Sequence, residues 1–130
     1  MWGARTLETK GRKTGLPRQT PVNLLVLDGE RYLVAPRGET QWVRNVRADD
    51  GRLTLIIGRR RQQWIGTEIT DPVAKVPVLR GYLKRWKAEV GVFFDGIGPE
   101  SADEKLAEIA PRHPVFRLAE VAGDLSVFGA

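Results

Sequence analysis

The sequence contains no cysteine and a single histidine, His113. A disulfide scaffold is therefore impossible, catalysis by a thiol is excluded, and a zinc site would need nearly all its ligands from Asp and Glu, which zinc rarely accepts. We predict no metal site. No paired carboxylates and no serine show the pattern of a hydrolase, so no catalytic side chain is assigned. Binding groups without catalytic ones are typical of an enzyme whose reactive group is a bound cofactor.

Long hydrophobic runs are also missing. No window approaches the ~18 apolar residues of a membrane-spanning helix, and the first residues have no apolar run of signal-peptide length. The sequence therefore predicts a cytoplasmic protein without a transmembrane segment. Of the 130 residues, 42% are hydrophobic and 28% are charged, which is ordinary globular usage and predicts a single domain over residues 1–130.

Charge is plentiful but unevenly placed. Lys and Arg number 21 against 16 Asp and Glu, for a net charge of +5. Residues 1–61 hold 13 basic and 6 acidic side chains, whereas residues 62–130 hold 8 and 10. The positive first half predicts an anionic partner, and composition leaves open a nucleic acid, a membrane surface or a phosphorylated small molecule.

The order of expected elements indicates the fold. Asp28-Gly29 separates two apolar runs of β-forming residues, which is the strongest short-range signal for a hairpin. Strands are expected over 4–10, 19–26, 31–35, 52–57, 62–69 and 115–118, and helices over 41–48, from 71 onward and over 101–110. Pro77 should delay or kink the second helix, and residues 101–104 match a capping box for the third. This order predicts a mainly β protein with α-helices, its antiparallel sheet curled into a small barrel with flanking helices and closed by the last strand.

The densest functional cluster is the loop after the first strand, residues 10–21. Two glycines let the backbone turn with exposed N–H groups, Arg12, Lys13 and Arg18 surround the turn, and Thr14 and Thr20 offer hydroxyls. A charge-assisted hydrogen bond contributes about 1.5–3 kcal/mol, so several could hold a phosphorylated ligand. The spacing is not that of a Walker loop, and a solvated hairpin loop is the alternative interpretation.

A second loop, residues 35–45, combines glycine, basic groups and an aromatic ring. Trp42 could cover a planar ligand or belong to the core. Asn45 could bond to a ring carbonyl or to backbone. Arg59, Arg60 and Arg61 are interpreted as a solvated hairpin tip that blunts pairing at a sheet edge.

Several stretches taken together resemble the deazaflavin-dependent nitroreductase family of actinobacteria, from about residue 6 to residue 69. The resemblance implies a split β-barrel that binds coenzyme F420, a deazaflavin with a phosphodiester and an acidic oligoglutamate tail. It also implies hydride transfer from the reduced coenzyme to a nitroaromatic, a quinone or another activated small-molecule acceptor. The stretches are Gly11-Arg12-Lys13-Thr14-Gly15-Leu16-Pro17-Arg18-Gln19-Thr20-Pro21, Asp28-Gly29, Val34-Ala35-Pro36-Arg37-Gly38 and Trp42-Val43-Arg44-Asn45-Val46-Arg47.

The same resemblance implies a set of coenzyme-binding residues. The phosphate and tail would be bound by Arg12, Lys13, Thr14 and Arg18. The linker would run beside Gln19, Thr20, Pro21 and Val22. The deazaflavin ring would be lined by Val34, Ala35, Pro36 and Arg37 and closed in by Gln41, Trp42, Val43, Arg44 and Asn45.

The sequence departs from the family pattern in three places. The glycine-rich loop before Trp42 is shorter, and the His-Pro that commonly precedes this tryptophan is missing. Where many members place a tyrosine beside the reacting carbon, this sequence has Val92-Phe93-Phe94-Asp95, so proton delivery from water is expected. The sequence starts almost at the first strand, without the helix that often precedes it, which predicts a more open pocket or one completed by another subunit.

Other functions fit parts of the sequence. An FMN-binding barrel is the nearest alternative, because a ring pocket and a phosphate loop could serve either coenzyme. A small basic barrel could instead bind nucleic acid, with Trp64 or Tyr32 stacking on bases, although no nucleic acid is expected. A non-catalytic carrier of the coenzyme would look the same. The sequence is also compatible with a homodimer and with peripheral membrane contact.

Overall fold

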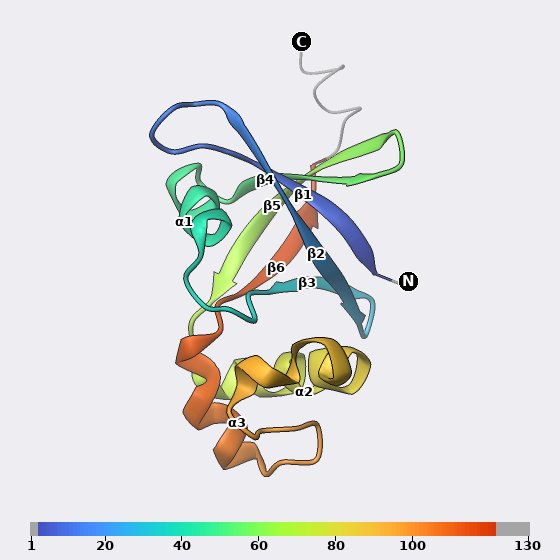
Figure 1. Cartoon of the computed structure of the whole chain (residues 1–130), viewed down its shortest axis with the longest axis vertical. Helices are drawn as coiled ribbons and strands as arrows, with labels where there is room; N and C mark the ends of the chain where they lie inside the picture. The colour runs from blue at the N-terminus through green and yellow to red at the C-terminus, as the bar shows by residue number, and fades with distance from the viewer. Residues whose placement is uncertain (1–2, 122–130) are drawn as a thin grey trace.

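Six antiparallel strands close into a barrel in the order β1-β2-β3-β6-β5-β4 (Figure 1). The computed structural model describes residues 3–121. The strands are β1 (Ala4–Lys10), β2 (Pro17–Leu27), β3 (Glu30–Val34), β4 (Arg52–Ile57), β5 (Arg60–Ile69) and β6 (Val115–Glu120). The α-helices are α1 (Gln41–Ala48), α2 (Pro72–Val90) and α3 (Asp103–Ile109), with short 3-10 turns η1 (Gly91–Phe94) and η2 (Ala110–Arg112). The expected order of elements and the antiparallel barrel are confirmed.

Tight turns and one long-range pairing build the barrel. The β2–β3 turn has positive φ at both Asp28 (51°) and Gly29 (80°), as the type I′ turn predicted for this dipeptide requires. The last strand, β6, pairs with β3 on one side and with β5 on the other. The expectation that the final strand closes the sheet is therefore confirmed.

The apolar residues form two cores. One fills the barrel and includes Leu7, Leu33 and Phe116, together with Val43 from α1. The other lies between the outside of the barrel and the layer made by α2, η1 and α3, where Leu79 and Phe94 are fully buried. Figure 1 shows this helical layer below the barrel and α1 beside the β1–β2 hairpin. None of the helices described in residues 3–121 is long and apolar enough to cross a membrane.

Helix α2 corrects the prediction for Pro77. The helix starts at Pro72 without delay, capped by Asp71, whose Oδ1 accepts a hydrogen bond from the Val73 N–H (3.1 Å). It runs through Pro77, and its only residue with non-helical angles is Trp86 (φ −127°, ψ 18°). Burial of Leu79 and neighbouring apolar residues holds the helix through a position where proline removes one hydrogen bond, because packing outweighs local propensity.

Two further local predictions are wrong. Ser101 does not cap α3, since its Oγ accepts from the Gly98 N–H (2.9 Å) and the helix begins only at Asp103, whose carboxylate pairs with Arg80. At the β4–β5 hairpin, Arg60 and Arg61 belong to β5 rather than to the turn. They do not blunt a sheet edge, because β4 also pairs with β1 in the closed barrel.

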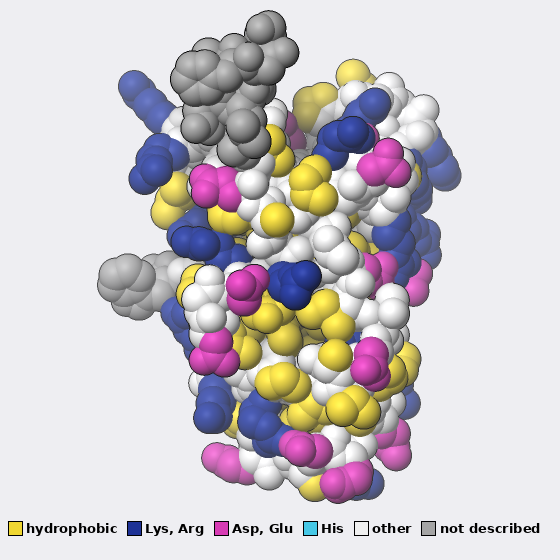
Figure 2. All heavy atoms as spheres, turned by 180° about the vertical axis from the view of Figure 1, so that it is seen from behind, with side chains coloured by type: hydrophobic (Ala, Val, Ile, Leu, Met, Phe, Trp, Pro, Cys, Tyr) yellow, Lys and Arg dark blue, Asp and Glu magenta, His cyan; other side chains and the backbone are white. Residues whose placement is uncertain are grey.

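The uneven charge of the sequence corresponds to the two halves of the structure. Figure 2 shows Lys and Arg side chains on both flanks of the barrel half, whereas acidic and basic side chains are mixed over the helical half. Residues 3–61, in which basic side chains predominate, form strands β1 to β4, the start of β5, helix α1 and the loops between them, and contribute nothing to α2, η1 or α3. The positive charge therefore belongs to the barrel.

Candidate functional site

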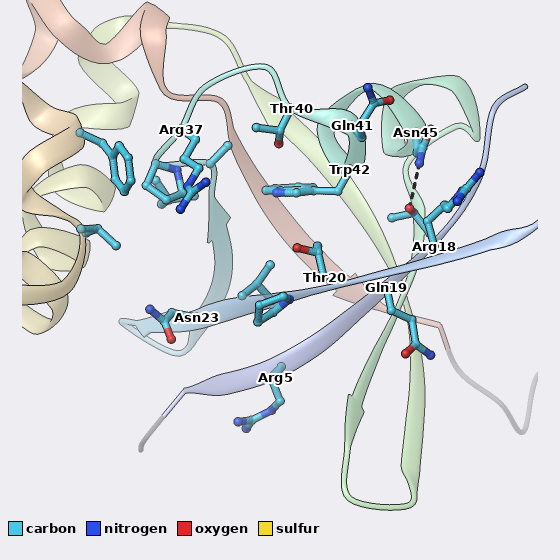
Figure 3. A pocket seen from close by; sticks show the side chains of 18 of the residues that line it. Arg5, Arg18, Gln19, Thr20, Asn23, Arg37, Thr40, Gln41, Trp42 and Asn45 are labelled. Atoms are coloured by element: carbon cyan, nitrogen blue, oxygen red, sulfur yellow. Dashed lines mark hydrogen bonds between the residues drawn. The ribbon is translucent and has the colours of Figure 1, made fainter.

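A cavity of about 1240 Å³ lies where β1, β2, the loop after β3, helix α1 and the C-terminal end of α2 meet. Figure 3 shows its long direction: Arg18 and Asn45 lie at one end, Trp42 and Thr20 in the middle, and Arg37 at the end beside the helical layer. Most residues of the predicted coenzyme site line it, namely Arg12, Lys13, Thr14, Arg18, Gln19, Thr20, Pro21, Val22, Val34, Ala35, Pro36, Arg37, Gln41, Trp42 and Asn45.

Two predicted site residues, Val43 and Arg44, are not brought to the cavity. Val43 is fully buried in the barrel core, and Arg44 lies on the exposed surface of α1. The cause is the helical repeat, because 3.6 residues per turn place Trp42 and Asn45 on one face and turn the two residues between them away. The sequence analysis predicts that all of residues 41–45 bind the coenzyme, but only one face of this helix can line a site.

The loop between β1 and β2 forms the basic end of the cavity and holds itself in shape. The Gly11 N–H donates to the Leu16 carbonyl (2.8 Å), and the Gly15 N–H donates to the Gly11 carbonyl (2.7 Å). A Cβ on Gly11 would lie 2.9 Å from both the Leu16 carbonyl oxygen and the Thr14 hydroxyl, so this tight turn requires glycine. The turn presents Arg12 and Lys13 to the cavity.

Asn45 links this basic loop to α1. Its Oδ1 accepts from the Arg12 backbone N–H (3.2 Å) and from Arg12 Nη1 (2.8 Å), and its Nδ2 donates to the Thr9 hydroxyl (3.2 Å). Arg12 Nη1 also donates to Gln41 Oε1 (2.8 Å). Asn45 is only 3% exposed, so these bonds are shielded from water. Asn45 thus bonds to the loop backbone, one of its two predicted roles, and fixes the Arg12 side chain as well.

Replacing Asn45 by alanine is expected to weaken binding of an anionic ligand at the loop about tenfold, although no positive charge is removed. The buried Thr9 hydroxyl and the part-buried Arg12 groups would lose their partner at a cost of about 1–3 kcal/mol, and Arg12 would no longer be held in place by Asn45. Ligand titration together with amide exchange of residues 11–16 measures both effects. Gln41→Ala is the comparison variant, because it removes only one exposed hydrogen bond to Arg12 and should weaken binding less than Asn45→Ala does.

The middle of the cavity is built around Trp42. Its ring packs on Phe116, with 5.8 Å between the ring centroids, and is partly exposed. Trp42 therefore contacts the barrel core and also lines the cavity. In Figure 3, Thr20 points toward Trp42, while Gln19 points away, as strand alternation requires. The Gln19 amide instead donates to Glu8 Oε1 on β1 (3.0 Å). Within residues 3–121, the buried Thr40 hydroxyl has no hydrogen-bond partner, although it lines the cavity above α1.

One wall of this middle section depends on His113. The Ala35 N–H donates to the Pro114 carbonyl (2.9 Å), and His113 Nδ1 lies 3.4 Å from the Ala35 carbonyl oxygen. The His113 ring stacks on Phe94 with 4.0 Å between centroids and is buried. Burial is the main cause that lowers the pKa of His113, so the ring is neutral near pH 7. The single histidine has a structural role.

Stability is expected to fall as the pH drops below about 6.5, the ordinary pKa of histidine. The unfolded chain binds a proton there while the folded protein, with its lowered His113 pKa, does not, so protonation favours unfolding. The contribution of neutral His113 to the free energy of unfolding is fully present above pH 6.5. It is lost as the pH falls toward the lowered pKa of the folded protein. Urea unfolding at pH 7.5 and 5.5 measures the difference. His113→Gln should remove much of it, and an unchanged pH dependence in that variant would contradict this role.

The end of the cavity beside α2 was not predicted. It is lined by Asn23 of β2, by Tyr82, Glu89 and Val90 of α2, and by Phe93 of η1. Asn23 Nδ2 donates to Glu89 Oε1 (3.2 Å), and burial raises the pKa of Tyr82 to about 12. Val90 lies on the buried face of α2, and no local sequence signal shows that this face continues into a cavity.

A closed antiparallel barrel with a cavity that joins a cationic loop to an aromatic pocket fits the split-barrel class of deazaflavin oxidoreductases. The sequence profile of the F420H(2)-dependent quinone reductase family matches residues 3–89, and the chain belongs to this family. It is therefore an F420-dependent oxidoreductase. No curated protein sequence matches the chain significantly.

Solved structures share the fold. A chain described as an F420-H2 dependent reductase is 18% identical, with a TM-score of 0.58 and alignment of 90% of this chain and 94% of that one. A Listeria innocua protein described as a candidate pyridoxamine 5′-phosphate oxidase is 12% identical, with a TM-score of 0.60 over 92% and 85%. A chain described as a domain-swapped dimer is 17% identical, with a TM-score of 0.57 over 90% and 80%.

Proposed function

We propose that the protein holds reduced coenzyme F420 along this cavity and reduces a quinone, a nitroaromatic or a similar activated acceptor. The observation that supports this most is the continuity of the cavity, which joins the cationic loop of Arg12 and Lys13 to the ring of Trp42. An elongated ligand with an acidic tail at one end and a planar ring at the other matches that arrangement of charge and apolar surface.

The residues present fit such a coenzyme. Arg12, Lys13, Thr14 and Arg18 supply donors for a phosphate and carboxylates, and the loop that carries them is already folded. The buried Thr40 hydroxyl, without a partner in the described part of the chain, is available to a polar atom on a bound ring. A bound polar ring would satisfy it, which removes the cost of burying an unpaired hydroxyl.

When bound, the reduced deazaflavin supplies the hydride. The chain's own part is to position that ring and to keep water away from it. Val34 and Ala35 are buried and apolar, and Trp42 covers the pocket from α1. Their contribution is orientation and exclusion of water around the reacting atoms.

The nucleic-acid alternative loses one of its two predicted stacking residues in the structure. Trp64 is 5% exposed within the barrel core, and the guanidinium of Arg31 lies over its ring at 5.4 Å. It therefore offers no free face on which a base could stack. FMN stays the nearest alternative coenzyme, because its phosphate and planar ring could use the same loop and pocket.

Titration of the purified protein with F420, and separately with FMN, tests the coenzyme while tryptophan emission is followed. F420 is expected to quench the emission in a saturable way at micromolar concentration, because Trp42 lies in the cavity wall. Tight FMN binding without saturable quenching by F420 would overturn the assignment. Turnover of a quinone or nitroaromatic with reduced F420 then distinguishes an enzyme from a carrier.

A homodimer is part of the proposal. The likeness to a chain described as a domain-swapped dimer supports it, and so does the exposure of apolar side chains such as Val26 and Val92. Light scattering coupled to size-exclusion chromatography is expected to give twice the 14.5 kDa chain mass. If the protein is a monomer at all concentrations, the homodimer is contradicted, while the proposed coenzyme and reaction are not affected.

A further inference from the structure

A second cavity, the barrel mouth, of about 690 Å³, lies at the end of the barrel where β1 begins and β4 and β6 end. Figure 1 shows the β4–β5 hairpin and the start of β1 on the side of the barrel away from α1. Among residues 3–121, Arg5 alone lines both the barrel mouth and the cavity that contains Trp42. The barrel mouth is therefore a separate space from the proposed coenzyme site.

Three arginines from different strands line the barrel mouth on the inward faces of those strands. Residues two or four positions apart share one face of a strand. Arg31 thus lies on the face of the fully buried Leu33, and Arg60 lies on the face of the buried Trp64. The guanidinium carbon of Arg31 is 5.4 Å from the centroid of the Trp64 ring, which confirms the inward direction. Arg5 of β1 is the third arginine.

The three arginines have little negative charge near them. None of them forms an ion pair within residues 3–121. Arg61, which also lines the barrel mouth, is paired with Glu8 of β1. In the described part of the lining, Glu120 is the one carboxylate. The barrel mouth therefore carries a net positive charge that the fold itself does not neutralise.

A buried hydrogen-bond donor lies among the residues that line the barrel mouth. Trp64 is 5% exposed, and over residues 3–121 its Nε1–H has no hydrogen-bond partner. A buried donor without a partner is costly and rare in folded proteins. An oxygen atom of a ligand bound here would accept this hydrogen bond and remove the cost.

The outer part of the barrel mouth is apolar. Ile57 is 50% exposed and Val121 is 37% exposed, and both line it. A ligand with an anionic group among the arginines can therefore place an apolar group over these two side chains. A phosphate monoester carries a charge of about −1.5 to −2 near pH 7 and suits the planar fork of arginine, so it matches several guanidinium groups better than a single carboxylate does.

We propose that the barrel mouth binds a small organic phosphate monoester. The phosphate oxygens accept hydrogen bonds from Arg31, Arg60 and the Trp64 indole N–H, and the organic group packs on Ile57. Arg31, Arg60 and Trp64 do not line the cavity that contains Trp42, so this site does not depend on the proposed function. It gives a role to the basic residues at the start of β5, which the coenzyme site does not use.

Phenyl phosphate is the probe, and the indole N–H resonance of Trp64 in nitrogen-15 NMR is the readout. Trp64→Phe identifies this resonance by its loss and keeps a large apolar side chain in place. Phenyl phosphate at constant ionic strength is expected to move the resonance in a saturable way, because the N–H gains an acceptor. Inorganic phosphate should bind at least about threefold more weakly, since it lacks a group that packs on Ile57.

Arg31→Gln and Arg60→Gln are each expected to weaken binding of phenyl phosphate about tenfold, because each removes a charge-assisted hydrogen bond. Arg59→Gln is the matched control. It removes the same charge from the adjacent position, in the turn between β4 and β5 and outside the lining. Its affinity should stay within about twofold of the wild-type value, because exposed charges are screened by salt.

Three results would overturn the proposal. In the first, the Trp42 indole resonance moves and that of Trp64 does not, which would place the phosphate in the other cavity. In the second, Arg59→Gln weakens binding as much as Arg31→Gln, so that only the general positive field matters. In the third, the protein binds vesicles that contain phosphatidic acid but not free phenyl phosphate. If F420 does not bind, the proposed function fails, while the Trp64 titration still decides this site.

Discussion

Replacing Arg12 and Lys13 together by alanine is expected to raise the Kd for F420 about 100-fold, which is about 2.7 kcal/mol. Each side chain can donate a charge-assisted hydrogen bond to the phosphate or the acidic tail, a contribution of about 1.5–3 kcal/mol before discounts for exposure. Arg12 is held by Gln41 and Asn45 before any ligand arrives, so little of that energy is lost in ordering it. Titration by tryptophan emission measures the effect.

The control for this variant removes the same amount of charge elsewhere. Arg59→Ala with Lys84→Ala also lowers the net charge by two, but neither residue lines the cavity. Its F420 affinity is expected to stay within about threefold of the wild-type value, because exposed charges at a distance are screened by salt. Equal losses in both double variants would mean that the general positive field, rather than the loop, attracts the coenzyme.

Replacing Gly51 by alanine is expected to lower the free energy of unfolding by about 3 kcal/mol or more. Gly51 has a φ of +84°, and a Cβ there would lie 2.4 Å from the carbonyl oxygen of Gly66. The Gly66 N–H donates to the Gly51 carbonyl (2.8 Å), so neither backbone can move without breaking this bond. Gly51 follows α1 closely, and its displacement would disturb the helix that carries Trp42. Urea unfolding measures the change.

Gly58→Ala is the matched control for Gly51→Ala. Gly58 also has a positive φ, +58°, but a Cβ there would meet no atom within 4 Å. Its free energy of unfolding is expected to fall only by the cost of a non-glycine residue at positive φ, about 1–2 kcal/mol. If both variants lose the same stability, the close approach of Gly51 to Gly66 contributes nothing.

Much of the fold could be predicted because its signals are local. The Asp28-Gly29 turn and the alternating strands specify hairpins without knowledge of distant residues. The failures occurred where distant packing decides the outcome. Pro77 stays inside a helix that the barrel supports, and Ser101 bonds to Gly98 rather than to α3. Arg61 on β5 pairs with Glu8 on β1, the strand on the other side of β4. No pattern within a few residues contains that information.

The same contrast between local signals and distant packing applies to the residues of the candidate site. The basic loop and Trp42 stand out because their residue types are unusual for a turn and for a short helix. Only the orientation of α1 about its own axis shows that Val43 and Arg44 point away from the cavity. Phe93 enters the cavity only because α2 packs along the barrel and brings η1 beside the loop of Arg37.

The closing strand β6 has a consequence for biosynthesis. On the ribosome, β3 and β5 emerge well before the strand that fills the space between them. A nascent chain that has reached only residue 114 therefore has two unpaired strand edges, which are templates for association with other chains. Pairing strands so distant in sequence is also slow, since a long loop must close first. Translation that stops before Val115 should accordingly yield insoluble chains rather than a weakened enzyme.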